Sequence, residues 1–307
     1  MSGVENPLFG AEQLQRELAG AKPPLLLDVR WQLVAKRPED AAHPVGYGDY
    51  LEAHLPGAVF IDLAQDLAGH GEPVDGRHPL PTPEDFAASV ARWGLAEGQE
   101  AVVYDDQGGM SAARAWWLLR HAGLRARVLD GGIQAWIASG GEVEAGAVTP
   151  SLPENPATVG WGRMPVLSAD GAAALAQNGV LLDARAAERF RGEVEPIDPR
   201  AGHIPGARSL PTAGNLGPGR RLLAADTLAA RFAQEGAMPG ASVGVYCGSG
   251  VTASHQILAL AAAGVDAALF PGSWSAWSND PARPVETGDA AHRRLADDGG
   301  PAVDFSL

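Results

Sequence analysis

Residues 242–260 read SVGVYCGSGVTASHQILAL, in which a β-rich apolar run, a glycine-rich turn and an Ala/Leu-rich segment follow one another directly. The run Ser242–Tyr246 predicts a buried strand, and Val251–Ala263 predicts a helix that Gly264 ends as a C-terminal cap. A strand that leads through a short turn into a helix is the building unit of parallel α/β sheets. Cys247 lies where this strand ends, and binding sites in open parallel sheets form at the carboxyl ends of strands.

The same alternation of strand and helix signals continues on both sides of this stretch. Val180–Asp183 and Ala267–Phe270 predict further strands, and Asp226–Gln234 predicts a helix with Asp226 as its N-cap. The first half of the chain carries matching signals at Ala101–Tyr104, Ser111–His121, Gly123 and Arg127–Leu129. Strands that alternate with helices imply parallel pairing, so each half is expected to form a mainly parallel sheet flanked by helices.

Three sequence blocks recur in the same order in the two halves. LLLDVR, HLPGA and GGIQAW begin at residues 25, 54 and 131, and LLDAR, HIPGA and GSWSAW begin at residues 181, 203 and 272. The offset between matched residues drifts from 155 for Asp28 and Asp183 to 141 for Trp136 and Trp277. A slow drift is expected of duplicated domains with loops of unequal length. The predicted fold class is therefore α/β, as a tandem repeat of two related domains.

The predicted domain boundaries follow from the repeat and from the positions of the prolines. The first domain spans residues 1–145, and the second spans residues 166–284. Between them, residues 146–165 hold four prolines and show little periodicity, which is typical of a linker. Residues 285–307 form a polar, glycine-rich tail.

Composition limits the expected partners and compartment. With 23 basic and 37 acidic residues among 307, the formal net charge is −14, so neither a nucleic-acid partner nor a membrane partner is expected. The N-terminus shows no signal-peptide pattern, and the longest apolar run, 257–265, is about half the length of a membrane span. Cys247 is the only cysteine, which excludes an intramolecular disulfide and a multi-cysteine metal site. A single cysteine fits a reducing compartment, and a cytoplasmic location is predicted.

Cys247 is a candidate nucleophile. Backbone N–H groups of the following turn, with the positive end of the next helix, favour a thiolate over a thiol. Gly248 and Gly250 let the backbone curl around the sulfur without Cβ clashes. The alternative is a buried, inert cysteine. A cysteine phosphatase loop needs an arginine six positions after its cysteine, where this chain has Ala253, and neither a dinucleotide fingerprint nor a Gly-x-Ser-x-Gly elbow surrounds Ser249.

The motif CGSGVT at 247–252, together with DAR at 183–185 and HIPGA at 203–207, resembles the two-domain rhodanese-family sulfurtransferases. The resemblance covers nearly the whole chain except the linker and the tail. It implies two rhodanese-like domains with one active site, in the second domain. Thiosulfate enzymes of this family typically carry basic residues just after the cysteine, whereas 3-mercaptopyruvate enzymes carry Gly-Ser. Gly248 and Ser249 make this loop similar to the 3-mercaptopyruvate type.

The first domain lacks the reactive residue. Its loop, VVYDDQGGMSAAR at 102–114, places Asp105 in line with Cys247. A carboxylate cannot carry a sulfane sulfur, so this copy is expected to be catalytically silent and to shape the cleft. His54 and His203 begin the matched HLPGA and HIPGA blocks of both domains, and they are predicted to be structural.

The resemblance also implies which residues bind the sulfur donor. The loop would bind it through Gly248, Gly250, Val251 and Thr252. Arg185 would lie at the mouth of the site, where an arginine can hold a carboxylate with two hydrogen bonds. Arg191, in RFRG, is a second candidate for this role. The alternative for Arg185 is a structural salt bridge with Asp183 or Glu188.

Proton transfer is assigned, again by resemblance, to Ser249 of the loop with His78 and Asp62 of the first domain. A histidine with an ordinary pKa of ~6.5 could protonate the carbon of a leaving enolate. The alternative is that Asp62 and His78 are structural loop residues.

The activity that the resemblance implies is sulfur transfer in two half-reactions. The Cys247 thiolate takes a sulfur from 3-mercaptopyruvate as a persulfide, and a thiol such as reduced thioredoxin, or cyanide, then accepts it. No metal and no organic cofactor is implied. Two alternatives stay open: thiosulfate as the donor, or a persulfide carrier that delivers sulfur to a partner protein.

Overall fold

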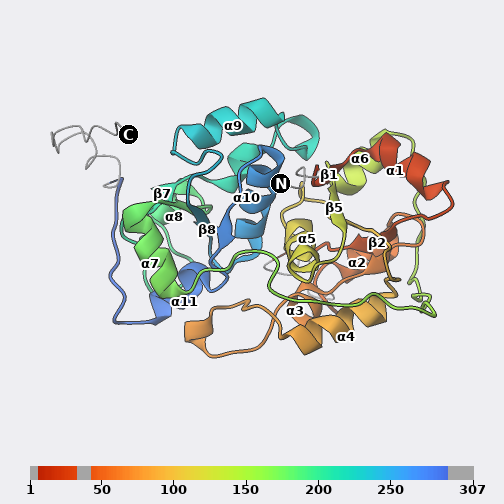
Figure 1. Cartoon of the computed structure of the whole chain (residues 1–307), viewed down its shortest axis with the longest axis horizontal. Helices are drawn as coiled ribbons and strands as arrows, with labels where there is room; N and C mark the ends of the chain where they lie inside the picture. Colours follow the sequence, from red (N-terminus) through yellow and green to blue (C-terminus); the bar gives the residue numbers. More distant parts are fainter. Residues whose placement is uncertain (1–5, 33–42, 290–307) are drawn as a thin grey trace, which may run out of the picture.

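The computed structural model describes residues 6–32 and 43–289, which form two α/β units lying side by side (Figure 1). We call the part up to residue 145 the first unit and the part from residue 166 the second unit. Of the predicted tail, residues 285–289 are described, and 290–307 lie outside the described residues. Among the helices that the structure describes, none combines the length and the apolar character that a bilayer span requires.

Each unit contains one sheet of short strands. The strands of the first unit are β1 Leu8–Phe9, β2 Leu25–Asp28, β3 Val59–Phe60, β4 Ala101–Tyr104 and β5 Ala126–Leu129. Those of the second unit are β6 Val180–Asp183, β7 Arg208–Ser209, β8 Val243–Tyr246 and β9 Ala268–Leu269.

The two sheets have the same topology. The first has the strand order β1-β5-β4-β2-β3 and the second has β7-β6-β8-β9, with parallel pairing between all neighbouring strands. Strands β6 to β9 therefore repeat β2 to β5. The place of β1 is taken in the second unit by a single parallel bridge between Val166 and Leu269. The predicted α/β tandem repeat with mainly parallel sheets is confirmed.

Helices flank both sheets. The first unit contains α1 Ala11–Leu18, α2 Tyr47–Glu52, α3 Leu63–Asp66, α4 Pro83–Trp93, α5 Ala112–His121 and α6 Gly132–Ala138, with the 3-10 turn η2 Pro73–Asp75. The second contains α7 Ala169–Asn178, α8 Ala187–Phe190, α9 Ala225–Ala233, α10 Val251–Ala262 and α11 Ser273–Asn279, with the 3-10 turns η3 Thr212–Asn215 and η4 Pro218–Arg220.

The two helix ends that the sequence predicted by capping signals have different outcomes. Helix α10 ends as predicted, because Gly264 takes a left-handed backbone conformation just beyond it. The prediction of Asp226 as an N-cap is wrong, since helix α9 begins at Ala225 and Ala224 occupies the cap position. Asp226 instead lies in the first turn, where a carboxylate interacts favourably with the helix dipole.

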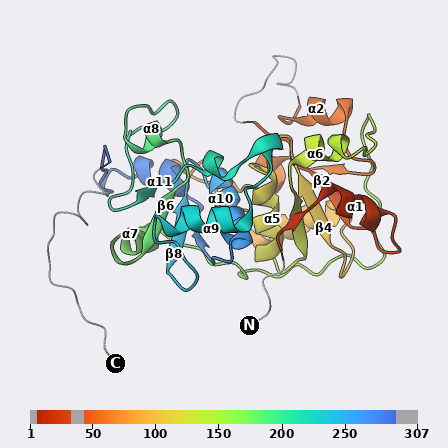
Figure 2. The same cartoon turned by 90° about the horizontal axis from the view of Figure 1, so that it is seen from above.

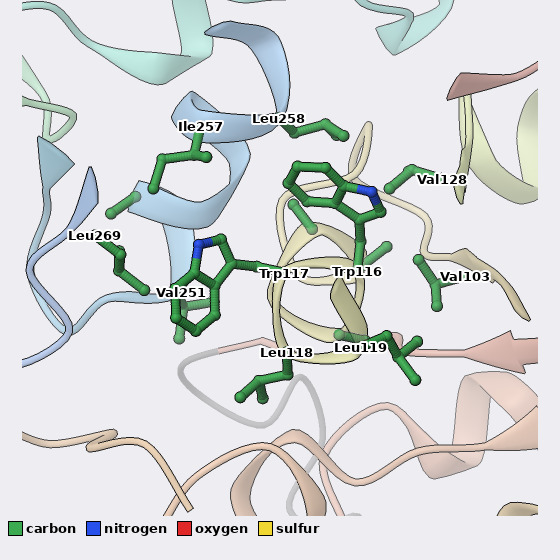
Figure 3. Packing of buried hydrophobic residues seen from close by; sticks show 14 of the residues in the cluster. Val103, Trp116, Trp117, Leu118, Leu119, Val128, Val251, Ile257, Leu258 and Leu269 are labelled. Atoms are coloured by element: carbon green, nitrogen blue, oxygen red, sulfur yellow. The ribbon is translucent and has the colours of Figure 1, made fainter. Parts of the chain in front are cut away.

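The core of the molecule runs without interruption across the boundary between the units. Helices α5 and α10 pack against each other between the two sheets (Figure 2). Trp116 and Trp117 of α5 belong to the same buried cluster as Val251 and Leu258 of α10 (Figure 3). Most residues of both helices are buried, several polar ones included. The first unit thus shares one hydrophobic core with the unit that carries Cys247.

Residues 146–165 connect the units and lie along the first unit. Backbone N–H groups of Ala157, Gly160 and Arg163 donate to carbonyls of that unit at 2.9 to 3.0 Å. The segment contains no helix or strand beyond an isolated bridge at Pro156. Several backbone hydrogen bonds therefore hold this connection to the first unit.

Candidate active site

Cys247 is the first residue after β8, and the loop that follows turns back over its sulfur. The N–H of Gly250 donates to Sγ at 3.1 Å. The N–H of Cys247 donates to Ser273 Oγ at 3.1 Å, and its carbonyl accepts from the N–H of Trp274 at 2.9 Å. Only 1% of Cys247 is exposed. The sulfur is therefore held at one point, beside the first turn of α10, where the helix dipole favours an anion.

A pocket of about 610 Å³ opens over Cys247 between the two units. The first unit contributes Trp31, Arg77 and Met110 to its walls. The second unit contributes the predicted loop residues, namely Gly248, Ser249, Val251 and Thr252, together with Arg185 and residues 186–189. Gly250 does not line the pocket and acts instead through its hydrogen bond to Sγ. A volume of this size suits a small molecule.

His78 and Ser249 meet across the boundary between the units. His78 Nδ1 lies 2.8 Å from Ser249 Oγ, so the structure brings this predicted pair together. The pKa of His78 is lowered to about 4, first by burial and then by the positive charges of Arg114 and Arg77. This differs from the ordinary pKa expected from the sequence. The imidazole is neutral at pH 7 and can accept a proton through Ser249.

Asp62 is not part of this pair. It is the N-cap of α3, and its Oδ1 accepts the N–H of Ala64 at 3.0 Å. Burial raises the pKa of its carboxyl group. In the described part of the chain no hydrogen bond joins it to His78, and it does not line the pocket over Cys247. The geometry thus gives Asp62 a capping role.

Arg185 lies beside the pocket, but its guanidinium is already occupied. It makes a bidentate ion pair with Asp183 and contacts Glu195 and the carbonyl of Gly202 at 3.3 and 2.7 Å. The side chain is 1% exposed. The first unit, which has no cysteine, repeats the arrangement with Arg30. Because the same ion pair occurs in the unit without a cysteine, it matches the alternative given for Arg185, a structural salt bridge with Asp183.

Arg191 lies outside the pocket. Its guanidinium pairs with Glu193 at 2.8 Å, and it is not among the residues that line the pocket over Cys247. The structure therefore brings neither predicted arginine, Arg185 or Arg191, to a free position over the sulfur.

Two other arginines approach the loop instead. A Cβ atom placed on Gly248 would lie 3.1 Å from Nη2 of Arg77 and 3.4 Å from Nη1 of Arg189. Both guanidinium groups pair with the buried carboxylate of Asp198, and Arg189 also pairs with Glu195 at 2.6 Å. Arg189 stands in the same RFRG motif as Arg191, and Arg77 directly precedes His78. The sequence could have suggested both arginines by these positions. It does not show which arginine side chains line the pocket over Cys247.

The corresponding loop of the first unit is built around a carboxylate. Asp105 follows β4 as Cys247 follows β8. Its two oxygens accept the N–H groups of Gln107, Gly109, Ser111 and Ala112 at 2.8 to 3.0 Å. The loop therefore closes around its own fixed anion and leaves no nucleophile at this place.

Fold and site together define a tandem α/β class in which one cysteine lies at a strand end, in a pocket between two related units. The family model described as "Rhodanese-like domain" matches residues 10–139 and 168–280. The chain belongs to the rhodanese family, and it is a sulfurtransferase that takes small-molecule sulfur donors and acceptors.

Named relatives differ in the donor that their names give. The chain is 46% identical to a "Probable 3-mercaptopyruvate sulfurtransferase" of Pseudomonas aeruginosa, with 92% of this chain and 98% of the relative covered. It is 44% identical to a "Putative thiosulfate sulfurtransferase SseB" of Mycobacterium tuberculosis, with the same coverage. The crystal structure of SseA from Escherichia coli, described among the 3-mercaptopyruvate sulfotransferases, matches with a TM-score of 0.73 at 32% identity, covering 88% of this chain and 99% of that one.

Proposed function

We propose that the donor is 3-mercaptopyruvate and that Cys247 carries the sulfur as a persulfide. The Cys247 thiolate attacks the donor sulfur, the carbon–sulfur bond breaks, and its electron pair stays on carbon as the enolate of pyruvate. An acceptor thiolate then attacks the outer sulfur of the persulfide, and Cys247 leaves again as a thiolate.

The observation that carries this proposal is the hydrogen bond between His78 and Ser249. The donor thiol loses a proton when its sulfur becomes part of the persulfide anion, and the enolate carbon gains one. The Ser249–His78 pair can relay the first proton to carbon. With a pKa of about 4 the ring is a weak base, so it holds the proton only briefly and gives it up readily. Thiosulfate needs no such step, because sulfite leaves without protonation. A proton-transfer pair at this place therefore favours the carbon-containing donor.

The donor carboxylate is assigned to Arg189 and Arg77. Both guanidinium groups pair with Asp198 and still approach Gly248 in the pocket wall. The Arg185 side chain, by contrast, is 1% exposed, and Arg191 does not line the pocket. Two cations near the sulfur also suit a dianion, so this pair supports thiosulfate as a second candidate donor. Transfer from 3-mercaptopyruvate requires proton transfer through Ser249, whereas transfer from thiosulfate does not. A variant of Ser249 can therefore distinguish the two donors.

Replacing Ser249 with alanine should separate the donors. We expect kcat/KM for 3-mercaptopyruvate to fall about 100-fold, because a proton-transfer path is removed. The value for thiosulfate should change less than about threefold. Steady-state kinetics with both donors and one shared acceptor measure this. A similar loss for both donors would remove the basis for preferring 3-mercaptopyruvate.

The RFRG motif offers a matched pair of variants for the carboxylate clamp. Arg189→Met should raise KM and lower kcat/KM for 3-mercaptopyruvate about 10- to 100-fold, the size expected for a lost charge-assisted hydrogen bond. Arg191→Met should change kcat/KM less than about twofold, because its ion pair with Glu193 is exposed. A larger loss of kcat/KM in Arg191→Met than in Arg189→Met would instead assign the donor carboxylate to Arg191.

A small thiol or a reduced thiol protein such as thioredoxin is the proposed acceptor, in a reducing compartment such as the cytoplasm. The single cysteine supports this, because a free thiol at the reaction centre must stay reduced between turnovers.

A further inference from the structure

Arg114 is a fully buried arginine at the boundary between the units. It lies on α5 of the first unit and is 0% exposed. Its guanidinium donates only to backbone carbonyls, namely those of Leu67 at 3.2 Å, His78 at 3.0 Å, Pro79 at 3.2 Å and Gly250 at 3.5 Å. It therefore touches both the segment that carries His78 and the loop that carries Cys247.

No carboxylate in the described part of the chain pairs with Arg114. The other arginines around the pocket all have such partners, since Arg77 and Arg189 face Asp198 and Arg185 faces Asp183. A buried cation without an anion is costly, and carbonyl dipoles compensate it only in part. The fold therefore keeps one unbalanced positive charge beneath the reactive loop.

The titratable group that interacts with the charge of Arg114 is Cys247. The carbonyl of Gly250 faces Arg114, and the N–H of the same residue donates to Sγ. Burial lowers the pKa of Arg114 to about 10, and Cys247 is the group whose negative charge raises it again. Arg114 thus contacts, from the first unit, the same residue whose N–H binds the sulfur.

We propose that Arg114 is a positioning residue that acts as the counter-cation of the Cys247 thiolate. On the proposed function, it stabilises this thiolate twice, as the nucleophile that attacks the donor and as the group that leaves when the acceptor takes the sulfur. The unit without a cysteine thereby supplies a permanent charge to the reaction centre.

Among the described residues, the other groups around the pocket carry no unpaired positive charge. Arg77, Arg185 and Arg189 are balanced by carboxylates, and Glu188 in the pocket wall has the wrong sign. His78 is neutral above pH ~5, because its pKa is about 4. The thiolate therefore depends on Arg114, the N–H of Gly250 and the start of α10.

The test is the pH profile of alkylation of Cys247 by iodoacetamide, which needs no sulfur donor. Since Cys247 is the only cysteine, the mass of the whole chain reports the reaction. The plateau rate at high pH reports access to the sulfur, and the midpoint of the profile reports formation of the thiolate. Arg114→Met should move the midpoint upward by about one to two pH units, the usual effect of losing a nearby opposite charge. Arg114→Lys should keep it close to that of the wild type.

His255→Gln is the matched control at the same boundary. His255 is fully buried on α10, and its ring contacts Thr212 Oγ1 at 2.7 Å and the carbonyl of Gly108 at 3.1 Å. Its pKa is lowered to about 4, mainly by burial, so this variant disturbs the interface without removing a charge at pH 7. We expect its midpoint to stay unchanged.

The outcomes separate a charge role from a packing role. A shift in Arg114→Met with none in Arg114→Lys and His255→Gln supports the proposal. An unchanged midpoint in Arg114→Met, or equal shifts in the Met and Lys variants, overturns it. If Arg114→Met does not unfold cooperatively, the neutral but polar Arg114→Gln takes its place. The alkylation assay uses no sulfur donor, so its result does not depend on which donor the enzyme prefers. The proposal for Arg114 and the proposal for the donor can therefore be contradicted independently.

Discussion

Cys247→Ser should abolish sulfur transfer with either donor. A hydroxyl group cannot form a persulfide, and serine is a far weaker nucleophile at neutral pH. The serine oxygen can still accept the N–H of Gly250, so the loop should keep its conformation. Mass spectrometry after donor treatment should show a gain of about 32 Da, one sulfur atom, on the wild type only.

Circular dichroism and thermal unfolding provide the control for this variant. Both should match the wild type, because the substitution is nearly isosteric and buries no new charge. Transfer by Cys247→Ser above the background of the uncatalysed reaction would contradict a covalent intermediate on this residue.

Gly250→Ala should be nearly as damaging. Gly250 has a φ of +80°, and an added Cβ would lie 2.5 Å from the carbonyl oxygen of Pro271. The loop must shift, and the N–H that donates to Sγ shifts with it. Losing one preorganised donor at a reacting anion typically costs about 10³-fold in rate, so we expect a loss of that size in single-turnover persulfide formation.

Gly264→Ala is the control at the other end of the same helix. Gly264 has a φ of +76°, but no atom lies within 4 Å of an added Cβ. The variant carries the same backbone cost of about 1–2 kcal/mol without the clash. It should lower the melting temperature and leave the rate of persulfide formation unchanged. Equal rate losses in the two glycine variants would mean that general destabilisation, not the loop geometry, limits the reaction.

Much of the fold was predictable because its signals are local. Strands β4, β6 and β8 and the start of α10 lie within one residue of their predicted bounds, since apolar runs and the glycines around them act on neighbouring residues. The capping error at Asp226 has a local cause too. The helix starts two residues earlier than predicted, with Ala224 at the cap position, and the acidic residue that suggested a cap lies inside the first turn.

The sequence does not determine which arginine lines the pocket. Arg185, Arg189 and Arg191 lie within seven residues of one another, and each is long enough to reach several partners. Their directions depend on Asp183 at the end of β6 and on Glu193, Glu195 and Asp198 in the loop after α8. Spacing along the chain does not encode which carboxylate each arginine meets.

The sequence by itself determined the tandem α/β repeat, the position of Cys247 at a strand end and the neutral loop around it, because these properties belong to contiguous residues. Only the tertiary structure decided what surrounds the sulfur. His78 reaches Ser249 over 171 positions of sequence, and Arg114 reaches Gly250 over 136. The Arg114 contact joins two helices, α5 and α10, that pack against each other, and η2, just before His78, packs against α11. Burial at this boundary lowers the pKa of His78 and that of Arg114.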